Sequence, residues 1–186
     1  MSADADFPPS DPVLERLAPE LARALAQAKV PTRTVEHEAV FTVDESQALR
    51  GTIPGVHTKN LFVKDKKGRH FLVTAAEDTP VDLKTLHGRI GASGRLSFSD
   101  AERMGRMLGV EPGSVTVLGL VNDRAGEVTL VLDERLLRHD ILNAHPLTNR
   151  ATTSLPLADL LRFLGATGHE PIVTPLSEAS NDGAPS

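Results

Sequence analysis

Two short polar stretches hold the residues best suited to chemistry. The first is His57-Thr58-Lys59-Asn60, which stands directly before the apolar run Leu61-Phe62-Val63. A lysine beside a buried strand either extends its ammonium to water along its aliphatic stem or holds an anionic or carbonyl group in a cleft. The residue types alone leave both interpretations open, and the first is the more common one.

The second stretch runs from Asn143 to Asn149 around His145-Pro146. Pro146 would stiffen a loop whose backbone N–H groups could face a carbonyl oxygen, while His145 and Asn143 supply side-chain hydrogen bonds. Lys59 would add a positive charge near a phosphate or a developing oxyanion. The simpler interpretation of His145 is an ordinary turn histidine, and without further information the residues favour it.

Other chemistries lack their signatures in this chain. Cysteine is absent, which excludes disulfides, thiolate metal sites and a cysteine nucleophile. The seven histidines show no His-x-x-x-His pair, so no metal is expected. Neither a Gly-x-Ser-x-Gly elbow nor a phosphate-binding loop ending in Gly-Lys-Ser/Thr is present. A serine with a distant histidine base stays possible but unsupported.

The charge balance argues against a general nucleic-acid binder. The 186 residues include 20 Lys and Arg against 25 Asp and Glu, a net charge of −5, and the six Phe are the only aromatic residues. The segment from Lys59 to His70 is nevertheless basic, which allows a small contact with a charged ligand. No apolar run is long enough to cross a bilayer and no signal peptide is apparent, so a cytoplasmic protein is expected.

Short strands mixed with short helices must position these stretches. The strand after Gly55 and a strand over 70–75 are joined by a Lys-Lys-Gly turn, which predicts a hairpin. A second hairpin is predicted from strands over 115–121 and 128–132. Further strands are expected over 32–36 (with Val35 as the inward residue), 96–98, 151–155 and 171–173. Helices are expected after an Asp11 cap, over 20–28, near 44–50, over 81–86, over 100–108 with Ser99 as the cap, over 133–138 and over 156–164.

This pattern predicts an α+β domain with a central mixed, mainly antiparallel sheet and flanking helices. The domain is expected to span 11–175 as a single unit, since no interior linker or repeat is apparent. The polar ends, 1–10 and 177–186, are expected to be disordered tails.

Three runs resemble the YbaK/prolyl-tRNA editing superfamily. They are Gly-Val-His-Thr-Lys-Asn-Leu-Phe-Val-Lys-Asp from Gly55, Leu-Gly-Val-Glu-Pro-Gly-Ser-Val-Thr from Leu108 and Asn-Ala-His-Pro-Leu-Thr-Asn-Arg-Ala-Thr-Thr from Asn143. They occur in the family's order, and the likeness covers roughly 17–174. Within the superfamily, the chain most resembles the freestanding ProX/PrdX-type proteins that remove alanine from mischarged tRNA(Pro).

The resemblance implies an aminoacyl-ester hydrolase that acts in trans without metal or cofactor. The essential lysine of the family maps onto Lys59, with Asn60 beside it. The family's Gly-x-x-x-Pro loop maps by its proline onto Pro146, but Leu142 stands where the glycine should be. This departure weakens the expected backbone oxyanion role of the loop and draws attention to His145.

The implied roles follow from the ester substrate, which is already activated. Lys59 would hold the terminal phosphate or the ester region, Asn60 and His145 would orient substrate or water, and a ribose hydroxyl could take part in proton transfer. The expected partners are the tRNA(Pro) acceptor end and, as a further candidate, prolyl-tRNA synthetase. Two alternatives stay open: removal of cysteine instead of alanine, and a binding module without catalysis. The expected substrate-binding residues, several equally plausible as core, are Thr58, Val35, Val40, Phe41, Val43, Asn143, Ala144 and Pro146.

Overall fold

The computed structural model describes residues 6–39 and 52–177. The expected helix near 44–50, and with it Val40, Phe41 and Val43, lies outside the described residues. Within them, no helix is long and apolar enough to span a membrane. The elements in chain order are α1 (Pro12–Leu17), α2 (Pro19–Gln27), β1 (Arg33–Glu36), β2 (Val56–Lys64), β3 (His70–Ala76), α4 (Leu83–Arg89), β4 (Ser97–Phe98), α5 (Ala101–Leu108), η1 (Val117–Asn122), β5 (Val128–Asp133), η2 (Glu134–Arg138), β6 (Ile141–Ala144), β7 (Ala151–Pro156), α6 (Leu157–Ala166) and β8 (Ile172–Thr174).

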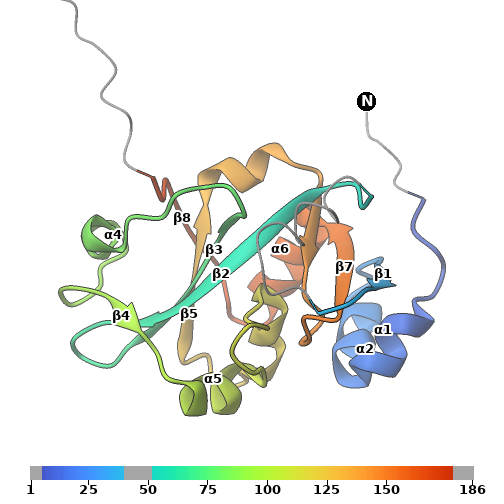
Figure 1. Cartoon of the computed structure of the whole chain (residues 1–186), viewed down its shortest axis with the longest axis horizontal. Coiled ribbons are helices and arrows are strands. Elements are labelled where there is room, and N and C mark those ends of the chain that lie inside the picture. Colours follow the sequence, from blue (N-terminus) through green and yellow to red (C-terminus); the bar gives the residue numbers. More distant parts are fainter. Residues whose placement is uncertain (1–5, 40–51, 178–186) are drawn as a thin grey trace, which may run out of the picture.

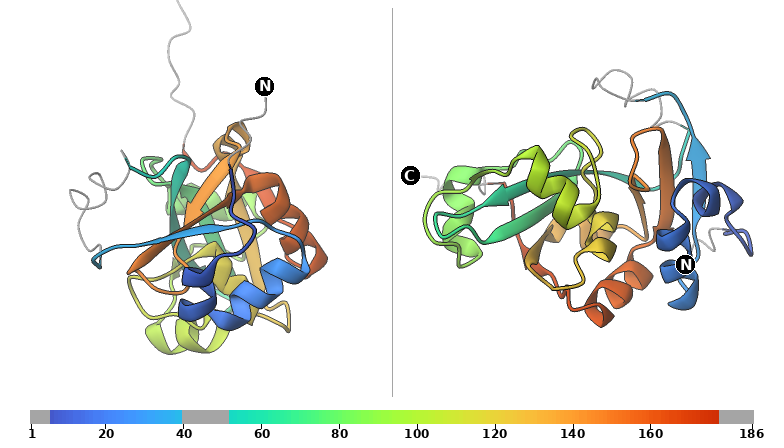
Figure 2. Two further views of the ribbon diagram at one scale, coloured as in Figure 1. Left: turned by 90° about the vertical axis from the view of Figure 1, so that its right-hand side faces the viewer. Right: turned by 90° about the horizontal axis from the view of Figure 1, so that it is seen from below.

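A central sheet with the strand order β1-β7-β6-β2-β3-β5-β8 organises the chain, and β4 pairs with β2 beside this path (Figure 1). Four of the strand pairings among the described residues are antiparallel and three are parallel. Helices flank this mixed sheet, and Figure 2 shows α1 and α2 at the end that carries β1. The predicted fold class is therefore confirmed.

The long strand β2 is the element that both predicted polar stretches depend on. It forms the predicted hairpin with β3, from Lys64↔His70 to Thr58↔Ala76. Its first two residues pair in parallel with β6, and its last two pair with β4. β2 therefore joins the β1-β7-β6 part of the sheet to the β3-β5-β8 part.

Successive side chains of β2 point to opposite sides of the sheet. Phe62 lies in the larger apolar core, which is formed mainly with α1, α2, α5, α6 and η1. Val63 belongs to a second apolar cluster, which includes Leu86 of α4. We call these sides the Phe62 face and the Lys59 face, because Lys59 lies an even number of residues from Val63.

The predicted second hairpin is wrong. Residues 117–122 form the 3₁₀ helix η1, capped by the Thr116 hydroxyl, which accepts a hydrogen bond from the Leu118 N–H at 3.2 Å. A Cβ at Gly119 would come within 3.1 Å of Leu108, so this segment packs closely on α5. A run that is apolar at every position cannot by itself distinguish a buried strand from a buried helix. β5 instead pairs in parallel with β3 and β8.

Three smaller expectations are also wrong. Thr34 rather than Val35 is the buried residue of β1, because its hydroxyl bonds to the Thr153 hydroxyl at 2.7 Å. Asp100 rather than Ser99 caps α5, and its carboxylate accepts from the Arg103 N–H at 2.8 Å. Finally, the polar stretch from Asn143 begins within strand β6 and not in a loop.

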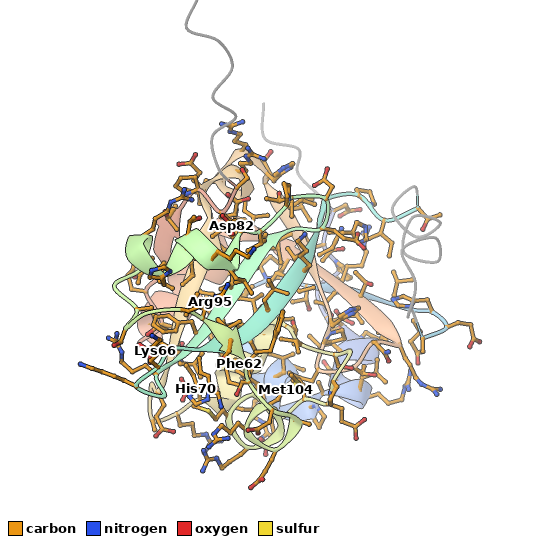
Figure 3. The ribbon with its side chains drawn as sticks, turned by 60° about the vertical axis from the view of Figure 1, so that its left-hand side comes forward. Phe62, Lys66, His70, Asp82, Arg95 and Met104 are labelled. Carbon is orange, nitrogen blue, oxygen red and sulfur yellow. The ribbon has the colours of Figure 1, made fainter. Side chains whose placement is uncertain are left out.

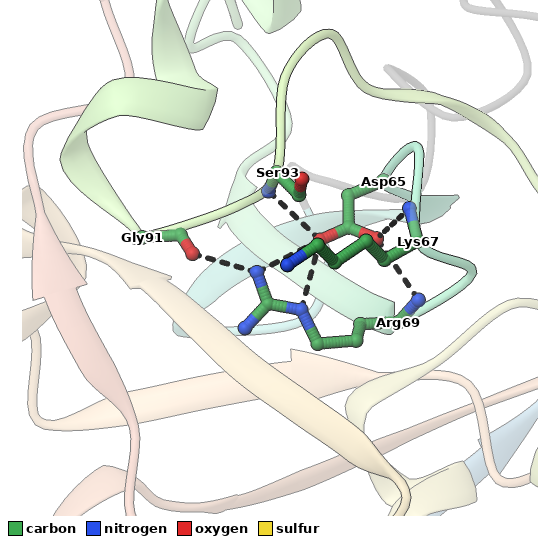
Figure 4. A network of polar contacts seen from close by, with 5 residues as sticks. All are labelled: Asp65, Lys67, Arg69, Gly91 and Ser93. Atoms are coloured by element: carbon green, nitrogen blue, oxygen red, sulfur yellow. Dashed lines mark hydrogen bonds and ion pairs between the residues drawn. The ribbon is translucent and has the colours of Figure 1, made fainter.

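The turn between β2 and β3 is held by one buried carboxylate (Figure 4). Asp65 accepts hydrogen bonds from the backbone N–H groups of Lys67, Arg69 and Ser93 at 2.8–3.0 Å and from the Arg69 guanidinium. Arg69 also donates to the Gly91 carbonyl at 2.7 Å. Burial by itself would raise the pKa of Asp65, but the hydrogen bonds outweigh it and lower the pKa from the ordinary 3.8 to about 2.

We expect Asp65→Asn to lower the stability of the protein, because an amide cannot accept all of these hydrogen bonds. A lowered carboxyl pKa stabilises the fold above the unfolded-state pKa, and this contribution is lost as the pH falls through the folded-state pKa. Urea denaturation gives the free energy of unfolding of wild type and variant. The difference between the two should therefore be constant at neutral pH and shrink between about pH 4 and about pH 2. Asp78→Asn is the control, since Asp78 is exposed. A gap independent of pH would contradict the prediction.

Candidate functional site

The half of the Lys59 face that lies near β6 is polar. His57 of β2 pairs with Asn143 of β6, which in turn pairs with Ser154 of β7. Residues paired across neighbouring strands share a face of the sheet, so these three side chains form one row. Lys59 lies two residues after His57 on β2 and therefore on the same face of the sheet.

Lys59 lies opposite Ala75 of β3, whose small side chain leaves room beside it. Its side chain is half-buried, and among residues 6–39 and 52–177 its ammonium has no hydrogen-bond or ion-pair partner. A partly buried cation without a protein partner is suited to bind an anion or a carbonyl oxygen from a ligand.

Asn143 fixes the position of this part of the sheet. It is 1% exposed, its amide donates to the Pro54 carbonyl at 3.1 Å, and its side-chain oxygen accepts from the Ser154 hydroxyl at 2.5 Å. The same amide lies 3.4 Å from Nε2 of His57. Because an amide N–H₂ only donates, His57 faces it with an unprotonated Nε2. Asn143 therefore holds the Pro54 loop and the His57 ring rather than offering itself to a ligand.

His145 follows β6, two residues beyond Asn143. Its Nδ1 lies 3.3 Å from the Ala151 carbonyl, which can only accept, so Nδ1 carries the proton and Nε2 keeps its lone pair. Burial lowers the pKa of His145; the Ala151 carbonyl and Glu77 oppose this shift, whereas protonation of His37 or His57 would lower the pKa further. No described residue bonds to Nε2 of His145, and a neutral imidazole with such a nitrogen can accept a proton from water.

Three of the sequence-predicted residues point to the Phe62 face instead. The Thr58 hydroxyl donates to the Asn143 carbonyl at 2.9 Å, which strengthens the short contact between β2 and β6. The Asn60 side-chain oxygen accepts from the Thr74 hydroxyl at 2.7 Å. Ala144 is buried in the larger core. Strand alternation thus directs Asn60 away from Lys59, its neighbour in sequence.

The remaining predicted residues differ in their surroundings. Pro146 is buried, close behind His145. Val35 is 40% exposed and pairs with Thr152 of β7, beside the polar row. Phe41 and Val43 lie outside the described residues, so their expected part in a substrate pocket stays a prediction.

Two polar residues near this row did not stand out in the sequence. His37 follows β1, and its Nε2 lies 2.9 Å from the Thr152 hydroxyl. Glu77 follows β3, and its backbone N–H donates to the His57 carbonyl at 2.9 Å. Each lies two residues beyond a residue of the Lys59 face, so the period of the strands could have revealed them once the strand pairing was known. Among the described residues, no group of three histidines or carboxylates is arranged to hold a metal ion.

Gly55 allows the loop before β2 to approach β6. Its φ is +114°, and a Cβ there would meet Cγ2 of Ile141 at 2.8 Å and Nδ2 of Asn143 at 3.1 Å. Gly68, in the β2–β3 turn, also has a positive φ of +79° but faces open space. The two glycines share the backbone requirement and differ in the space around them.

We expect Gly55→Ala to destabilise the protein by about 1–3 kcal/mol more than Gly68→Ala, because only the first adds overpacking to backbone strain. Urea denaturation of both variants measures this difference. The Gly55 variant should also lose activity at the site, since Asn143 must move. Equal stability losses in the two variants would show that the loop around Gly55 accommodates the added Cβ without further loss of stability.

The fold belongs to a known structural class. A solved structure of the hypothetical protein APE2540 superposes with a TM-score of 0.66 at 20% identity, over 86% of this chain and 99% of that one. A structure described as that of a candidate trans-editing enzyme for prolyl-tRNA synthetase superposes with a TM-score of 0.64 at 24% identity, over 88% of this chain and 99% of that one. These likenesses establish the fold.

The family follows from the sequence comparisons. The family described as the aminoacyl-tRNA editing domain matches residues 37–163, more than half of the chain. The prolyl-tRNA editing protein ProX of Acetoanaerobium sticklandii is 36% identical over 146 residues, which cover 78% of this chain and 88% of ProX. The prolyl-tRNA synthetase associated domain-containing protein 1 of Danio rerio is 42% identical over 159 residues, covering 84% and 86% respectively. The chain therefore belongs to the aminoacyl-tRNA editing domain family, as its resemblance to the YbaK/prolyl-tRNA editing superfamily predicted.

Proposed function

We propose that this protein hydrolyses the aminoacyl ester of mischarged tRNA(Pro) in trans, with alanyl-tRNA(Pro) as its substrate. The observation that carries the proposal is the half-buried Lys59, which has no partner among the described residues and shares a face of the sheet with His57, a neighbour that acts electrostatically on His145, in a chain of the editing-domain family. Similarity to ProX and to a synthetase-associated protein supports tRNA(Pro) as the RNA, with prolyl-tRNA synthetase as a further candidate partner.

Lys59 carries the electrostatic part of the reaction in this proposal. Water adds to the ester carbonyl, and negative charge then develops on the carbonyl oxygen. An ammonium already in place stabilises that charge more in the transition state than in the ground state. Lys59 can bind this oxygen or the adjacent phosphate without first breaking an ion pair, because no described residue pairs with it.

His145 carries the proton in this proposal. Its Nε2, to which no described residue bonds, accepts a proton from the attacking water as the new C–O bond forms. The proton then passes to the ribose oxygen as the ester bond breaks, and the products are a free amino acid and a tRNA with a free terminal hydroxyl. Asn143 and Asn60 act through their neighbours, as positioning residues, because their side-chain oxygens accept hydrogen bonds from the Ser154 and Thr74 hydroxyls.

Substrate choice depends on the size of the side-chain pocket. A small apolar pocket excludes larger side chains but distinguishes a single added group only weakly. Val35 is a candidate for its lining because it is exposed beside the polar row. Cysteinyl-tRNA(Pro) is the alternative substrate, and a non-catalytic module that binds aminoacyl-tRNA is the alternative function.

We expect Lys59→Ala to lower kcat/KM for alanyl-tRNA(Pro) by about 100-fold or more, as removal of one preorganised oxyanion donor does. Deacylation of alanyl-, cysteinyl- and prolyl-tRNA(Pro) by wild type and variant measures this effect. Lys84→Ala is the matched control, because Lys84 is exposed on α4, away from the row. Full activity in Lys59→Ala would remove the central role of this residue. Hydrolysis of cysteinyl-tRNA(Pro) alone would identify cysteinyl-tRNA(Pro) as the substrate. If wild type hydrolyses none of the three, the non-catalytic binding module is the function that stays open.

The proposed role of His145 predicts a pH dependence. A base must be neutral to act, so kcat/KM should fall as the pH drops through the pKa of His145 in the free enzyme. Because burial lowers this pKa, the fall should lie below the ordinary histidine value of 6.5. His145→Gln should lower the plateau and abolish this fall, after subtraction of uncatalysed ester hydrolysis. An unchanged profile in His145→Gln would assign the pH dependence to another group.

A further inference from the structure

Glu77 adds a carboxylate to the polar row of the Lys59 face. Its backbone N–H donates to the His57 carbonyl at 2.9 Å. In the hairpin register Thr58 pairs with Ala76, and one further step along both strands places Glu77 opposite His57. Residues opposite each other on neighbouring strands share a face of the sheet. The carboxylate of Glu77 therefore belongs to the Lys59 face, beside the candidate site.

The effect of Glu77 on His145 also places this carboxylate in the site. Burial is the largest cause that lowers the pKa of His145, and the charge of Glu77 opposes it. A Coulomb interaction weakens with distance, and Glu77 is half-buried, which limits its screening by solvent. Glu77 is the one acidic group among the main influences on this pKa within the described residues, so the site contains a carboxylate as well as the Lys59 ammonium.

Glu77 and Lys59 are diagonal neighbours on the two strands of the hairpin. Lys59 pairs with Ala75, and Glu77 lies two residues after Ala75 on the same face. The Cα atoms of such diagonal neighbours are about 7–8 Å apart. Lys59 forms no ion pair with Glu77, since it has no partner among residues 6–39 and 52–177. A ligand that carries both a carbonyl oxygen and a cation can therefore contact the two charges at once.

The other acids of the segment after β3 are directed elsewhere. Asp82 caps α4 (Figure 3), where its carboxylate accepts from one backbone N–H at 3.0 Å and from the Thr85 hydroxyl at 2.8 Å. Asp78 is exposed and lines a hollow beside η2. Of these acids, Glu77 is the one that the strand register directs toward Lys59.

An aminoacyl ester carries a carbonyl oxygen and a cation on adjacent carbon atoms. In the proposed function its carbonyl oxygen lies at Lys59. Its α-amino group, with an ordinary pKa of about 7.7–8.0, is mostly protonated at about pH 7. Because the Lys59 ammonium repels this second cation, the α-ammonium needs a negative group close by. Glu77 supplies one on the same face, one strand away from Lys59.

We propose that Glu77 binds the α-ammonium of the aminoacyl group and makes the site selective for esters of free amino acids over esters whose amino group is acylated. This inference rests on the proposed function, since it takes the ester carbonyl to lie at Lys59. An acyl group removes the positive charge and with it a charge-assisted hydrogen bond. A carboxylate accepts several hydrogen bonds, so Glu77 can bind the ammonium in addition to a contact within the protein. Peptidyl-tRNA, in which the amino group is acylated, is accordingly a poor substrate.

The test measures binding of two stable analogues of the aminoacyl end, in which an amide replaces the ester. They are the alanyl amide of 3′-amino-3′-deoxyadenosine and its N-acetyl derivative. At about pH 7, wild type should bind the free amine about tenfold more tightly than the acetylated form. Glu77→Gln should remove this preference by weakening binding of the free amine alone, and Glu77→Asp should keep part of it. Asp78→Asn, which removes the next carboxylate along the chain, should bind both analogues as wild type does.

The outcomes separate this proposal from the proposed function, because binding of the amides requires no hydrolysis. If wild type deacylates no aminoacyl-tRNA but keeps the Glu77-dependent preference, the proposed function fails and the α-ammonium site stands. If wild type binds both analogues equally, or binds neither, the proposal is overturned, whatever the hydrolysis shows. A preference that survives in Glu77→Gln would overturn it as well, since another group would then bind the ammonium. Equal loss of affinity for both analogues in Glu77→Gln and Glu77→Asp would overturn it by showing a structural role.

Discussion

The short parallel contact between β2 and β6 is the constraint on which the candidate site depends. Only two residue pairs form it, Val56↔Leu142 and His57↔Asn143. Side chains strengthen it: the Thr58 hydroxyl bonds to the Asn143 carbonyl, and the Asn143 amide bonds to the Pro54 carbonyl. Without this contact, the lysine of one chain segment and the histidine of another, some 85 residues later, would not share a face of the sheet.

The alternation of β2 divides its side chains between structure and chemistry. Thr58, Asn60 and Phe62 face the larger core or bond to neighbouring strands, whereas His57 and Lys59 face the polar row. A buried polar side chain must find a hydrogen-bond partner, and the buried Thr74 hydroxyl finds one in the Asn60 side-chain oxygen. Lys59 has none among the described residues, so the neighbouring positions 59 and 60 have opposite roles although both are polar.

β2 is held at both of its ends. Asn143 fixes the end near the polar row, and the Asp65 carboxylate fixes the turn into β3 (Figure 4). Buried polar groups of this kind specify one arrangement, because any displacement leaves them unsatisfied. A strand held in this way keeps Lys59 in a constant position beside the polar row.

The sequence by itself determined the elements and the residue types. Turn signals predicted the β2–β3 hairpin, Asp11 and Pro12 predicted the first helix, and the runs around Lys59 and His145 predicted the family. These features depend on local backbone preferences or on short motifs. The run over 115–121 was misread because its apolar residues are buried on every side, which local pattern does not reveal.

Only the tertiary structure decided which polar residues meet. The pairing of β2 with β6 and of β6 with β7 determines that His57, Asn143 and Ser154 form one row, and that Asn60 and Ala144 lie on the other face. It also brings His37 and Glu77 near His145. Strand register over long sequence separations depends on the packing of the whole core, and no local signal in the chain encodes it. The sequence therefore allowed the chemistry of the residues to be predicted, but not the direction in which each side chain points.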